Sequence, residues 1–358
     1  MKDLLIIATS DLKPEQEKPQ SNTAHPQVEY VLLAQKVGAD FLNYAYYQDL
    51  LMGDLLRRIE TTIRSDITLS LAGLRRSTRY KTIIAMSERV GIPLAFYKRL
   101  GLLQSKLIFR FTAWSARQES LFTKYDLLSY VDHIIVESQP LGDLLHTRFG
   151  VPRSQITFVP YSIDVDYFTP SKASANTGRI KPKLFSAGEI RGRDYATLIE
   201  AVTPLTDVDV EIAASGTWFA REKDTSLDTE LPPNITIAGR KPRSEMRASY
   251  ADASFVVVPL YDQVFSAGIT VVLEALAMGK AVITTKSKGL ASYLKDGENC
   301  CLVAPENPQE MRNAITHLLN NPSLARKLGK NARKSAENQF GLDSFVGQLE
   351  GVISSVQQ

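Results

Sequence analysis

The sequence is poor in the side chains that usually build metal sites and disulfide frameworks. Its 358 residues include two cysteines and four histidines. Cys300 and Cys301 are adjacent, so they provide neither a disulfide framework nor a spaced pair of metal ligands. The histidines show no His-x-x-x-His spacing either. We therefore expect a reducing compartment and no protein-built metal site.

Long hydrophobic runs and a dinucleotide-binding fingerprint are also missing. No run reaches the roughly 18 apolar residues that a membrane-spanning helix needs. The first apolar run, Leu4–Ala8, lacks the long apolar core of a signal peptide, so it predicts a β-strand in a cytoplasmic protein. No Gly-x-Gly-x-x-Gly follows this strand, which argues against a dinucleotide-dependent oxidoreductase.

Short apolar runs alternate with helical patterns along the whole chain. This alternation predicts parallel sheets with helices on both faces, which is an α/β fold. A cluster of Pro, Ser and Gly interrupts it within residues 161–183 and predicts a linker. We therefore predict two domains, residues 1–165 and 180–340, that bind ligands at the carboxyl ends of their strands.

Positive charge is concentrated between Arg57 and Arg110. This segment holds twelve Lys or Arg residues and three Asp or Glu residues, which leaves a local net charge of +9. It is either an ordinary solvated face or a patch for an anionic acceptor or an acidic membrane surface. The sequence leaves both interpretations open, and we expect no nucleic-acid partner.

Residues 264–283 contain the most informative motif. Gly268 stands before an apolar helical pattern and allows a ligand to approach the backbone closely. The free N–H groups and the positive dipole end of that helix suit a phosphate group. We therefore predict phosphate binding at Ala267, Gly268, Ile269 and Thr270.

Glu274 interrupts this apolar helix with a single carboxylate, and Thr270 lies one turn earlier on the same face. Because an unpaired buried carboxylate is unfavourable, Glu274 needs a partner or an opening to a ligand. It either accepts hydrogen bonds from ligand hydroxyls or pairs with a neighbouring Lys or Arg.

The C-terminal motifs together resemble glycosyltransferase family 4. Lys280-Ala281-Val282-Ile283 follows the glutamate helix, an Asp296-Gly297-Glu298-Asn299 turn comes next, and a short strand ends at Pro305. Upstream, residues 156–164 are similar to the family's Pro-Asn-Gly-Val-Asp segment. The likeness covers roughly residues 130–340, whereas the first 130 residues match the family only in their alternation of strand-like and helix-like segments. It implies a GT-B fold of two Rossmann-like domains, with a final helix, 342–358, packed on the N-terminal domain.

The resemblance also implies roles for residues that bind the nucleotide. Glu274 matches the second glutamate of the family's Glu-x7-Glu motif, which contacts the ribose. Ser266 stands where the family has the first glutamate, near the transferred sugar, so this chain departs from the pattern. Asp262, four residues before Ser266, is the acidic residue nearest to that position in the sequence. Gly239 and Arg240 end a strand at the place where the family holds the base.

In the family, an Arg and a Lys in the loop after the first C-terminal strand bind the diphosphate. Here that loop begins at Gly188, Arg193 takes the Lys position and Arg191 can supply the second cation. Two guanidinium groups beside a helix start can neutralise a leaving diphosphate without a metal. On the acceptor side, Glu88 is either a base or the partner of Arg89 or another neighbouring cation.

The resemblance implies a retaining glycosyltransferase that moves sugar from a nucleoside-diphosphate sugar to a glycan, lipid-linked or small-molecule acceptor. No cofactor beyond this donor is expected. We place the protein in the cytoplasm, either free or peripheral on the inner face of the membrane. Ser266 keeps open a catalytically weak nucleotide-sugar-binding subunit that supports a partner enzyme. A GT-B sugar-nucleotide epimerase is a third alternative, without a signature of its own.

Overall fold

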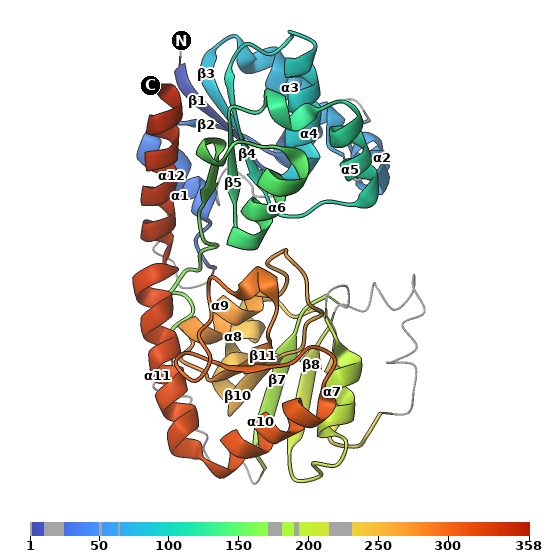
Figure 1. The fold of residues 1–358 in the computed structure, drawn as a ribbon, viewed down its shortest axis with the longest axis vertical. Helices are drawn as coiled ribbons and strands as arrows, with labels where there is room; N and C mark the ends of the chain where they lie inside the picture. Colours follow the sequence, from blue (N-terminus) through green and yellow to red (C-terminus); the bar gives the residue numbers. More distant parts are fainter. Residues whose placement is uncertain are drawn as a thin grey trace. The chain divides into compact units, whose positions relative to one another are not determined.

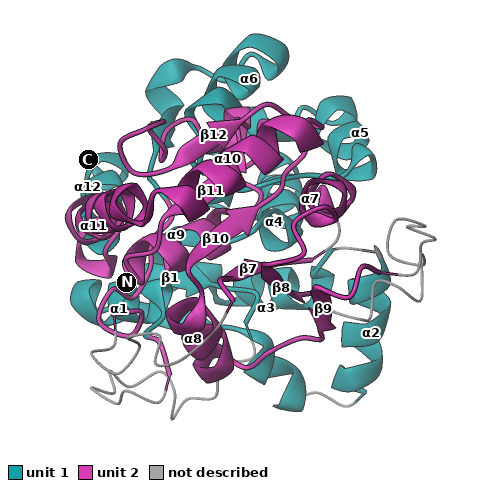
Figure 2. Ribbon diagram, turned by 90° about the horizontal axis from the view of Figure 1, so that it is seen from below, with its two compact units in different colours: residues 1–21, 27–160, 345–358 teal, residues 22–26, 161–344 magenta. Residues whose placement is uncertain are grey.

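The computed structural model describes residues 2–10, 25–49, 52–63, 65–170, 181–189, 193–214 and 231–358. The chain forms two compact units. Unit 1 comprises residues 1–21, 27–160 and 345–358, and unit 2 comprises residues 22–26 and 161–344 (Figure 2). Each unit has its own parallel sheet with helices around it, which confirms the predicted α/β class.

Unit 1 is built on a six-stranded sheet in the order β2-β1-β3-β4-β5-β6, with every neighbouring pair parallel (Figure 1). The central strands are buried on both faces, as expected for strands covered by helices on either side. The strands are β1 (Lys2–Ile7), β2 (Asp40–Leu42), β3 (Tyr80–Ala85), β4 (Lys106–Phe111), β5 (His133–Val136) and β6 (Ile156–Phe158).

Helix α6 of unit 1 begins and ends at recognisable capping residues. The Ser138 side chain accepts a hydrogen bond from the Leu141 N–H at the start of α6, and Gly150 ends that helix in the left-handed conformation. The helices are α1 (Glu29–Val37), η2 (Tyr44–Asp49), α2 (Gly53–Ile63), α3 (Ile67–Ser77), α4 (Glu88–Arg99), α5 (Ala116–Lys124), η3 (Leu127–Tyr130), α6 (Gln139–Phe149), η4 (Arg153–Gln155) and most of α12 (Leu342–Gln357).

Unit 2 has a second six-stranded parallel sheet, in the order β12-β11-β10-β7-β8-β9. Its strands are β7 (Lys183–Ala187), β8 (Asp209–Ala213), β9 (Ile235–Ala238), β10 (Phe255–Val258), β11 (Val282–Thr285) and β12 (Cys301–Val303). Its helices are α7 (Tyr195–Val202), α8 (Arg243–Asp252), α9 (Ile269–Ala277), η5 (Lys288–Leu290), α10 (Pro308–Asn320) and α11 (Pro322–Gln339).

The C-terminal helix α12 completes the core of unit 1. Its apolar residues recur at helical spacing and are buried with Leu4, Ile6 and Ile84 of the sheet. They are Phe345, Val346, Leu349, Val352 and Ile353. An ion pair between Lys36 and Glu350 joins α12 to α1, which lies beside it (Figure 1).

The described part of the predicted linker is packed into unit 2. Tyr167 and Phe168 are buried, and the Asp164 carboxylate accepts hydrogen bonds from the backbone of residues 166 and 167. Arg333 of α11 donates to the carbonyls of Val165 and Phe168. Residues 161–170 are therefore held in place, and residues 171–180 lie outside the described residues.

None of the helices in the described ranges has both the length and the apolar character needed to cross a membrane.

Candidate functional site

The strand order of unit 2 creates a switch point between β7 and β10. From this point the chain adds β8 and β9 on one side and β11 and β12 on the other. Loops that leave neighbouring strands in opposite directions open a crevice at the carboxyl ends of these strands. Here the loops after β7 and β10 meet, because Arg193 forms a β-bridge with Leu260 and the Asp194 N–H donates to the Pro259 carbonyl at 3.2 Å.

Gly268 begins α9 at this switch point and has a left-handed backbone, with φ of 82°. A Cβ atom there would lie 2.9 Å from Leu260 Cδ2 and 3.3 Å from Arg193 Nη1. Glycine is thus required by both the backbone conformation and the close packing. The first-turn amides of a helix have no partner within the helix. At this start the Ile269 N–H is turned back to the Ser266 carbonyl at 3.1 Å.

Arg193 lies against this helix start and is buried, with 7% of its surface exposed. Its Nε donates to the Ala187 carbonyl at 3.0 Å. Its guanidinium fills the space beside Gly188, where a Cβ atom would lie 2.3 Å from Nη2. Burial lowers the pKa of Arg193. Among the described residues no ion pair joins a carboxylate to this guanidinium, although the charge of Glu189 acts to raise its pKa. A buried cation in this position suits an anionic ligand.

Ser266, Ala267 and Thr270 surround the same helix start. Ser266 is buried, whereas Ala267 and Thr270 are partly exposed. The loop before them is held by Gly289, whose N–H donates to the Gln263 carbonyl at 2.7 Å. A Cβ atom on Gly289 would overlap the Phe265 carbonyl, so the two segments are in close contact.

The Asp262 carboxylate already has partners within the protein. Its carboxylate accepts the Lys288 N–H at 3.0 Å and pairs with the Lys288 side chain at 3.0 Å. The backbone hydrogen bond is the main cause that lowers its pKa. Asp262 therefore does not take the place of the glutamate that Ser266 replaces.

Glu274 is buried within α9, with 1% of its surface exposed, and both of its carboxylate oxygens have partners. One oxygen pairs with the Arg243 guanidinium, and the other accepts the Tyr250 hydroxyl at 2.7 Å. Burial raises the pKa of Glu274, and the charge of Arg243 opposes this shift. This is the paired arrangement that the sequence left open. A ligand hydroxyl reaches the first oxygen only if Arg243, whose side chain is 52% exposed, moves away.

The sequence interpretation missed Arg243 and Tyr250 as partners of Glu274. Both belong to α8, about 30 residues upstream, and no local spacing connects them to α9. The one available signal was the need of any buried carboxylate for a counter-charge.

The remaining predicted residues of unit 2 lie at the same edge of the sheet. Gly188 directly follows β7, and Gly239 and Arg240 directly follow β9, so all three stand at carboxyl ends of parallel strands. Gly239 and Arg240 are exposed. Arg191 lies outside the described residues.

In unit 1, Glu88 begins α4 just after β3, at the carboxyl edge of the first sheet. It accepts the Thr112 hydroxyl at 3.0 Å, and burial raises its pKa. Arg89 is not its ion-pair partner, because that guanidinium donates to both oxygens of Asp66 at 2.8 and 2.7 Å. The alternative of a Glu88–Arg89 ion pair is therefore wrong.

A second ion cluster in unit 1 was not predicted. Arg110, at the end of β4, is buried and pairs with Glu29 at 3.1 Å and with Glu137 at 2.5 Å. These groups stand at the carboxyl edge of the sheet, near Glu88. Among the described residues, no group of three or more His, Cys, Asp and Glu side chains could hold a metal ion.

Sequence comparison links the C-terminal half to known enzymes. Residues 172–335 match the family model described as glycosyl transferases group 1. The chain is 26% identical to the MMP alpha-(1->4)-mannosyltransferase of Mycolicibacterium hassiacum over 61% of this chain and 53% of that protein. It is 25% identical to the lipopolysaccharide core biosynthesis mannosyltransferase LpcC of Rhizobium leguminosarum over 75% of both. An uncharacterized glycosyltransferase of Methanocaldococcus jannaschii is 28% identical over 44% of each chain, so the chain spans about half the length of some curated relatives.

Structural comparison shows the same two-domain fold in solved proteins. Sucrose-phosphate synthase from Thermosynechococcus elongatus superposes with a TM-score of 0.75 at 15% identity, over 99% of both chains. Anabaena HepE, in complex with UDP-glucose, superposes with a TM-score of 0.73 at 14% identity, over 99% of this chain and 100% of that one. At these identities the likeness concerns the fold alone, and it confirms the predicted GT-B architecture.

Proposed function

The chain belongs to the group 1 glycosyltransferases, and on this premise we propose that it moves a sugar from a nucleoside-diphosphate sugar to an acceptor hydroxyl with retention of configuration. The observation that carries the proposal is Arg193. Its buried guanidinium, without a carboxylate partner in the described chain, stands beside the start of α9. Two sources of positive potential side by side suit a diphosphate.

The same arrangement suits the chemistry of transfer. When the bond from sugar to diphosphate breaks, negative charge grows on the diphosphate oxygens. Preorganised donors stabilise such developing charge strongly because they need no reorganisation. Arg193 and the first-turn amides of α9 after Ile269 are donors of this kind, and Arg191 would add a second cation, so the proposed reaction needs no metal.

The remaining roles follow from position. Gly188 and Gly268 leave room for the Arg193 guanidinium, the proposed ligand of the diphosphate, beside the backbone. Gly239 and Arg240 are the proposed site for the base, and Glu274 would bind ribose hydroxyls once Arg243 has moved. Ser266 would face the transferred sugar, and Glu88 is the proposed acceptor-side group of unit 1.

Relatives and fold neighbours support the donor class. HepE binds UDP-glucose, and two relatives are named mannosyltransferases, so we propose a hexose carried on a nucleoside diphosphate. A glycan, a lipid-linked sugar or a small molecule would accept it, in the cytoplasm.

One observation favours a second candidate, a nucleotide-sugar-binding subunit with little activity. Ser266 replaces the family's first glutamate, and Asp262 is paired with Lys288. No charged carboxylate of this loop is left for the sugar. In that case the site would bind the donor without transferring it.

Mutation of Arg193 separates the two candidates. Nucleotides are first screened by thermal shift, and hydrolysis and transfer are then measured with the matching donor. If the chain is an enzyme, Arg193→Ala lowers turnover by about 10²-fold or more, the usual loss for one strong electrostatic contact, and Ser266→Ala lowers it far less. Arg312→Ala is the matched control, because Arg312 also donates to backbone carbonyls, at Glu200 and Ala201 of α7. Tight donor binding without hydrolysis or transfer, and an Arg193→Ala variant that loses binding alone, would support the binding subunit.

A further inference from the structure

Helix α2 of unit 1 has its apolar face directed outward. Leu55, Leu56 and Ile59 are 47%, 37% and 51% exposed, and Met52 just before the helix is 62% exposed. Their i, i+3, i+4, i+7 spacing forms a single stripe, which helices of globular proteins normally bury. By contrast, Glu60 of the same helix is 5% exposed.

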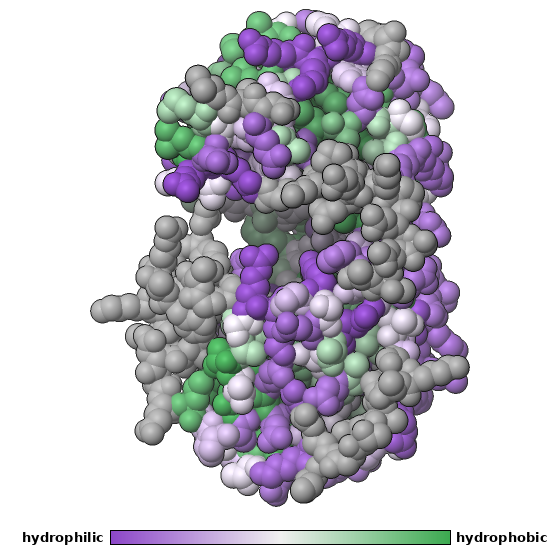
Figure 3. Space-filling view, turned by 180° about the vertical axis from the view of Figure 1, so that it is seen from behind, coloured by the Kyte–Doolittle hydropathy of each residue, from purple (hydrophilic) through white to green (hydrophobic). Residues whose placement is uncertain are grey.

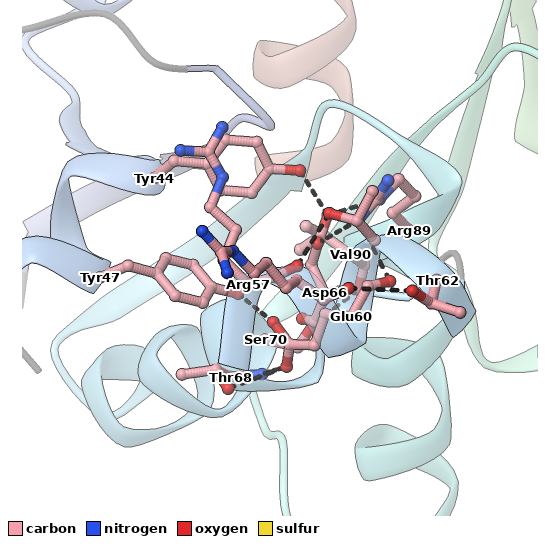
Figure 4. Close-up of polar contacts among 12 residues, drawn as sticks. Tyr44, Tyr47, Arg57, Glu60, Thr62, Asp66, Thr68, Ser70, Arg89 and Val90 are labelled. Carbon is pink, nitrogen blue, oxygen red and sulfur yellow. Dashed lines mark hydrogen bonds and ion pairs between the residues drawn. The ribbon is translucent and has the colours of Figure 1, made fainter. Parts of the chain in front are cut away.

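Polar contacts hold the helix in this orientation (Figure 4). The Glu60 carboxylate accepts the Thr68 N–H at 2.6 Å and the Thr68 hydroxyl at 2.8 Å, and it also accepts the Tyr47 hydroxyl. The Arg57 guanidinium lies over the Tyr44 ring, 4.6 Å from its centre. These contacts bind the polar side of α2 to the rest of unit 1. The apolar stripe on the opposite side of the helix therefore faces outward.

Helix α3 begins beside α2, since Glu60 of α2 accepts the Thr68 N–H and hydroxyl. Ile67 and Leu71, at i and i+4, are 42% and 45% exposed, and Arg75 continues the stripe one turn further on. In the space-filling view, hydrophobic side chains gather at the edge of unit 1 where α2 lies, with hydrophilic side chains beside them (Figure 3).

The charges around the stripe are mainly positive. Arg58 on α2 and Arg75 on α3 are exposed, whereas Asp54 is the exposed acid of α2. The other two acids of this region, Glu60 and Asp66, are buried in hydrogen bonds. Four further cations of the segment between Arg57 and Arg110 have carboxylate partners of their own; they are Lys81, Arg89, Lys98 and Arg110.

We propose that this surface, the α2 face (Met52, Leu55, Leu56 and Ile59, with Arg58), docks on a lipid bilayer that carries acidic headgroups. The apolar side chains enter the boundary between headgroups and acyl chains, and the arginines bind lipid phosphates. A second copy of the chain fits less well, because a two-fold contact uses the same patch on both copies and would place two Arg58 side chains in one interface.

Vesicle sedimentation of the full-length protein tests the proposal. We expect binding to vesicles with about 30 mol% acidic phospholipid, no binding to neutral vesicles, and a loss of binding as salt rises. Replacing both Leu55 and Ile59 by Ser should lower the partition coefficient by about tenfold or more. Arg58→Gln should lower it by about fivefold, the effect of one basic residue near an acidic surface.

Matched controls come from the other edge of the unit 1 sheet. Leu102 is 58% exposed and Lys106 is exposed at the start of β4, so both stand at the amino edge, whereas α3 begins at the carboxyl edge. Leu102→Ser and Lys106→Gln should therefore bind vesicles like the unchanged protein. Ile59→Trp gives a second readout, since its fluorescence should shift to the blue with acidic vesicles alone.

Three results would overturn the proposal: absence of binding, equal binding to neutral and acidic vesicles, and equal losses in the α2 and control variants. A change of oligomeric state in the Leu55/Ile59 variant, seen by sedimentation velocity without vesicles, would assign the face to a second copy instead. The assay contains no donor or acceptor, so its result is independent of the proposed sugar transfer.

Discussion

At the scale of single residues, two glycines and one arginine define the candidate donor site. Gly188 and Gly268 approach the Arg193 guanidinium so closely that a Cβ atom on either would contact it. The glycines thereby allow an arginine to be buried between backbone segments, and the helix start adds its own positive potential. Substitutions at this point should affect binding of an anion more than the rest of the fold.

We expect Gly268→Ala to weaken donor binding and to destabilise the protein by about 1–2 kcal/mol, because alanine is strained at a φ of 82°. The new methyl group would also press on Leu260 and Arg193. Calorimetry with the donor and urea unfolding measure the two effects. Gly351→Ala is the control, because that exposed helical glycine has open space around it. Equal behaviour of the two variants would contradict the role of Gly268.

Glu274→Ala should reduce donor affinity by about 1.5–3 kcal/mol if the carboxylate accepts ribose hydroxyls. Arg243→Ala should not reduce affinity in that case, because it frees the oxygen that the ribose would use. Titration calorimetry of both variants with the donor nucleotide makes the comparison, with the exposed Glu337→Ala as control. Unchanged affinity in Glu274→Ala would leave the carboxylate with a purely structural role, holding Arg243 and Tyr250.

At the scale of elements, α12 makes unit 1 depend on the end of the chain. Its buried residues share a core with β1 and β3, which come from the first 85 residues. Such non-local packing is typical of a unit that cannot form fully until the last segment has been added. Phe345 is central to it, since it is 1% exposed and lies under the Arg110 guanidinium at 5.2 Å.

Phe345→Ala should therefore destabilise unit 1 by about 3–5 kcal/mol, as large-to-small changes in cores do. Ser354→Ala, at an exposed position of the same helix, should change stability by less than about 0.5 kcal/mol. Urea unfolding monitored by circular dichroism provides the comparison. A small effect at Phe345 would mean that α12 does not contribute to the core in solution.

At the scale of the whole molecule, buried carboxylates should shape the dependence of stability on pH. Burial raises the pKa of Glu88 above its ordinary value of 4.5. The folded protein therefore holds a proton at this site that the unfolded chain releases. Between pH 4.5 and the raised pKa, the contribution of Glu88 to the free energy of unfolding falls as pH rises.

Glu88→Gln should remove the part of the pH dependence of the unfolding free energy that Glu88 contributes. Above the raised pKa, the variant should therefore gain stability relative to the unchanged protein. Urea unfolding at a series of pH values from 4 to 8 checks the expectation. Glu245→Gln, which removes a carboxylate at the surface of α8, is the control. An unchanged slope in Glu88→Gln would show that the carboxyl group titrates alike in both states.

The sequence by itself determined the α/β class and the glycine at the start of α9. These features depend on hydrophobic periodicity and on the φ angles that a single residue allows, and both are local properties. Only the tertiary structure decided which charged side chains form ion pairs with each other. Glu274 pairs with Arg243 of another helix, and Arg89 pairs with Asp66 and not with its neighbour Glu88. Of the basic residues between Arg57 and Arg110, some form buried ion pairs and others are exposed. These contacts join side chains that are up to about 80 residues apart in the sequence, so the spacing of residues along the chain does not predict them.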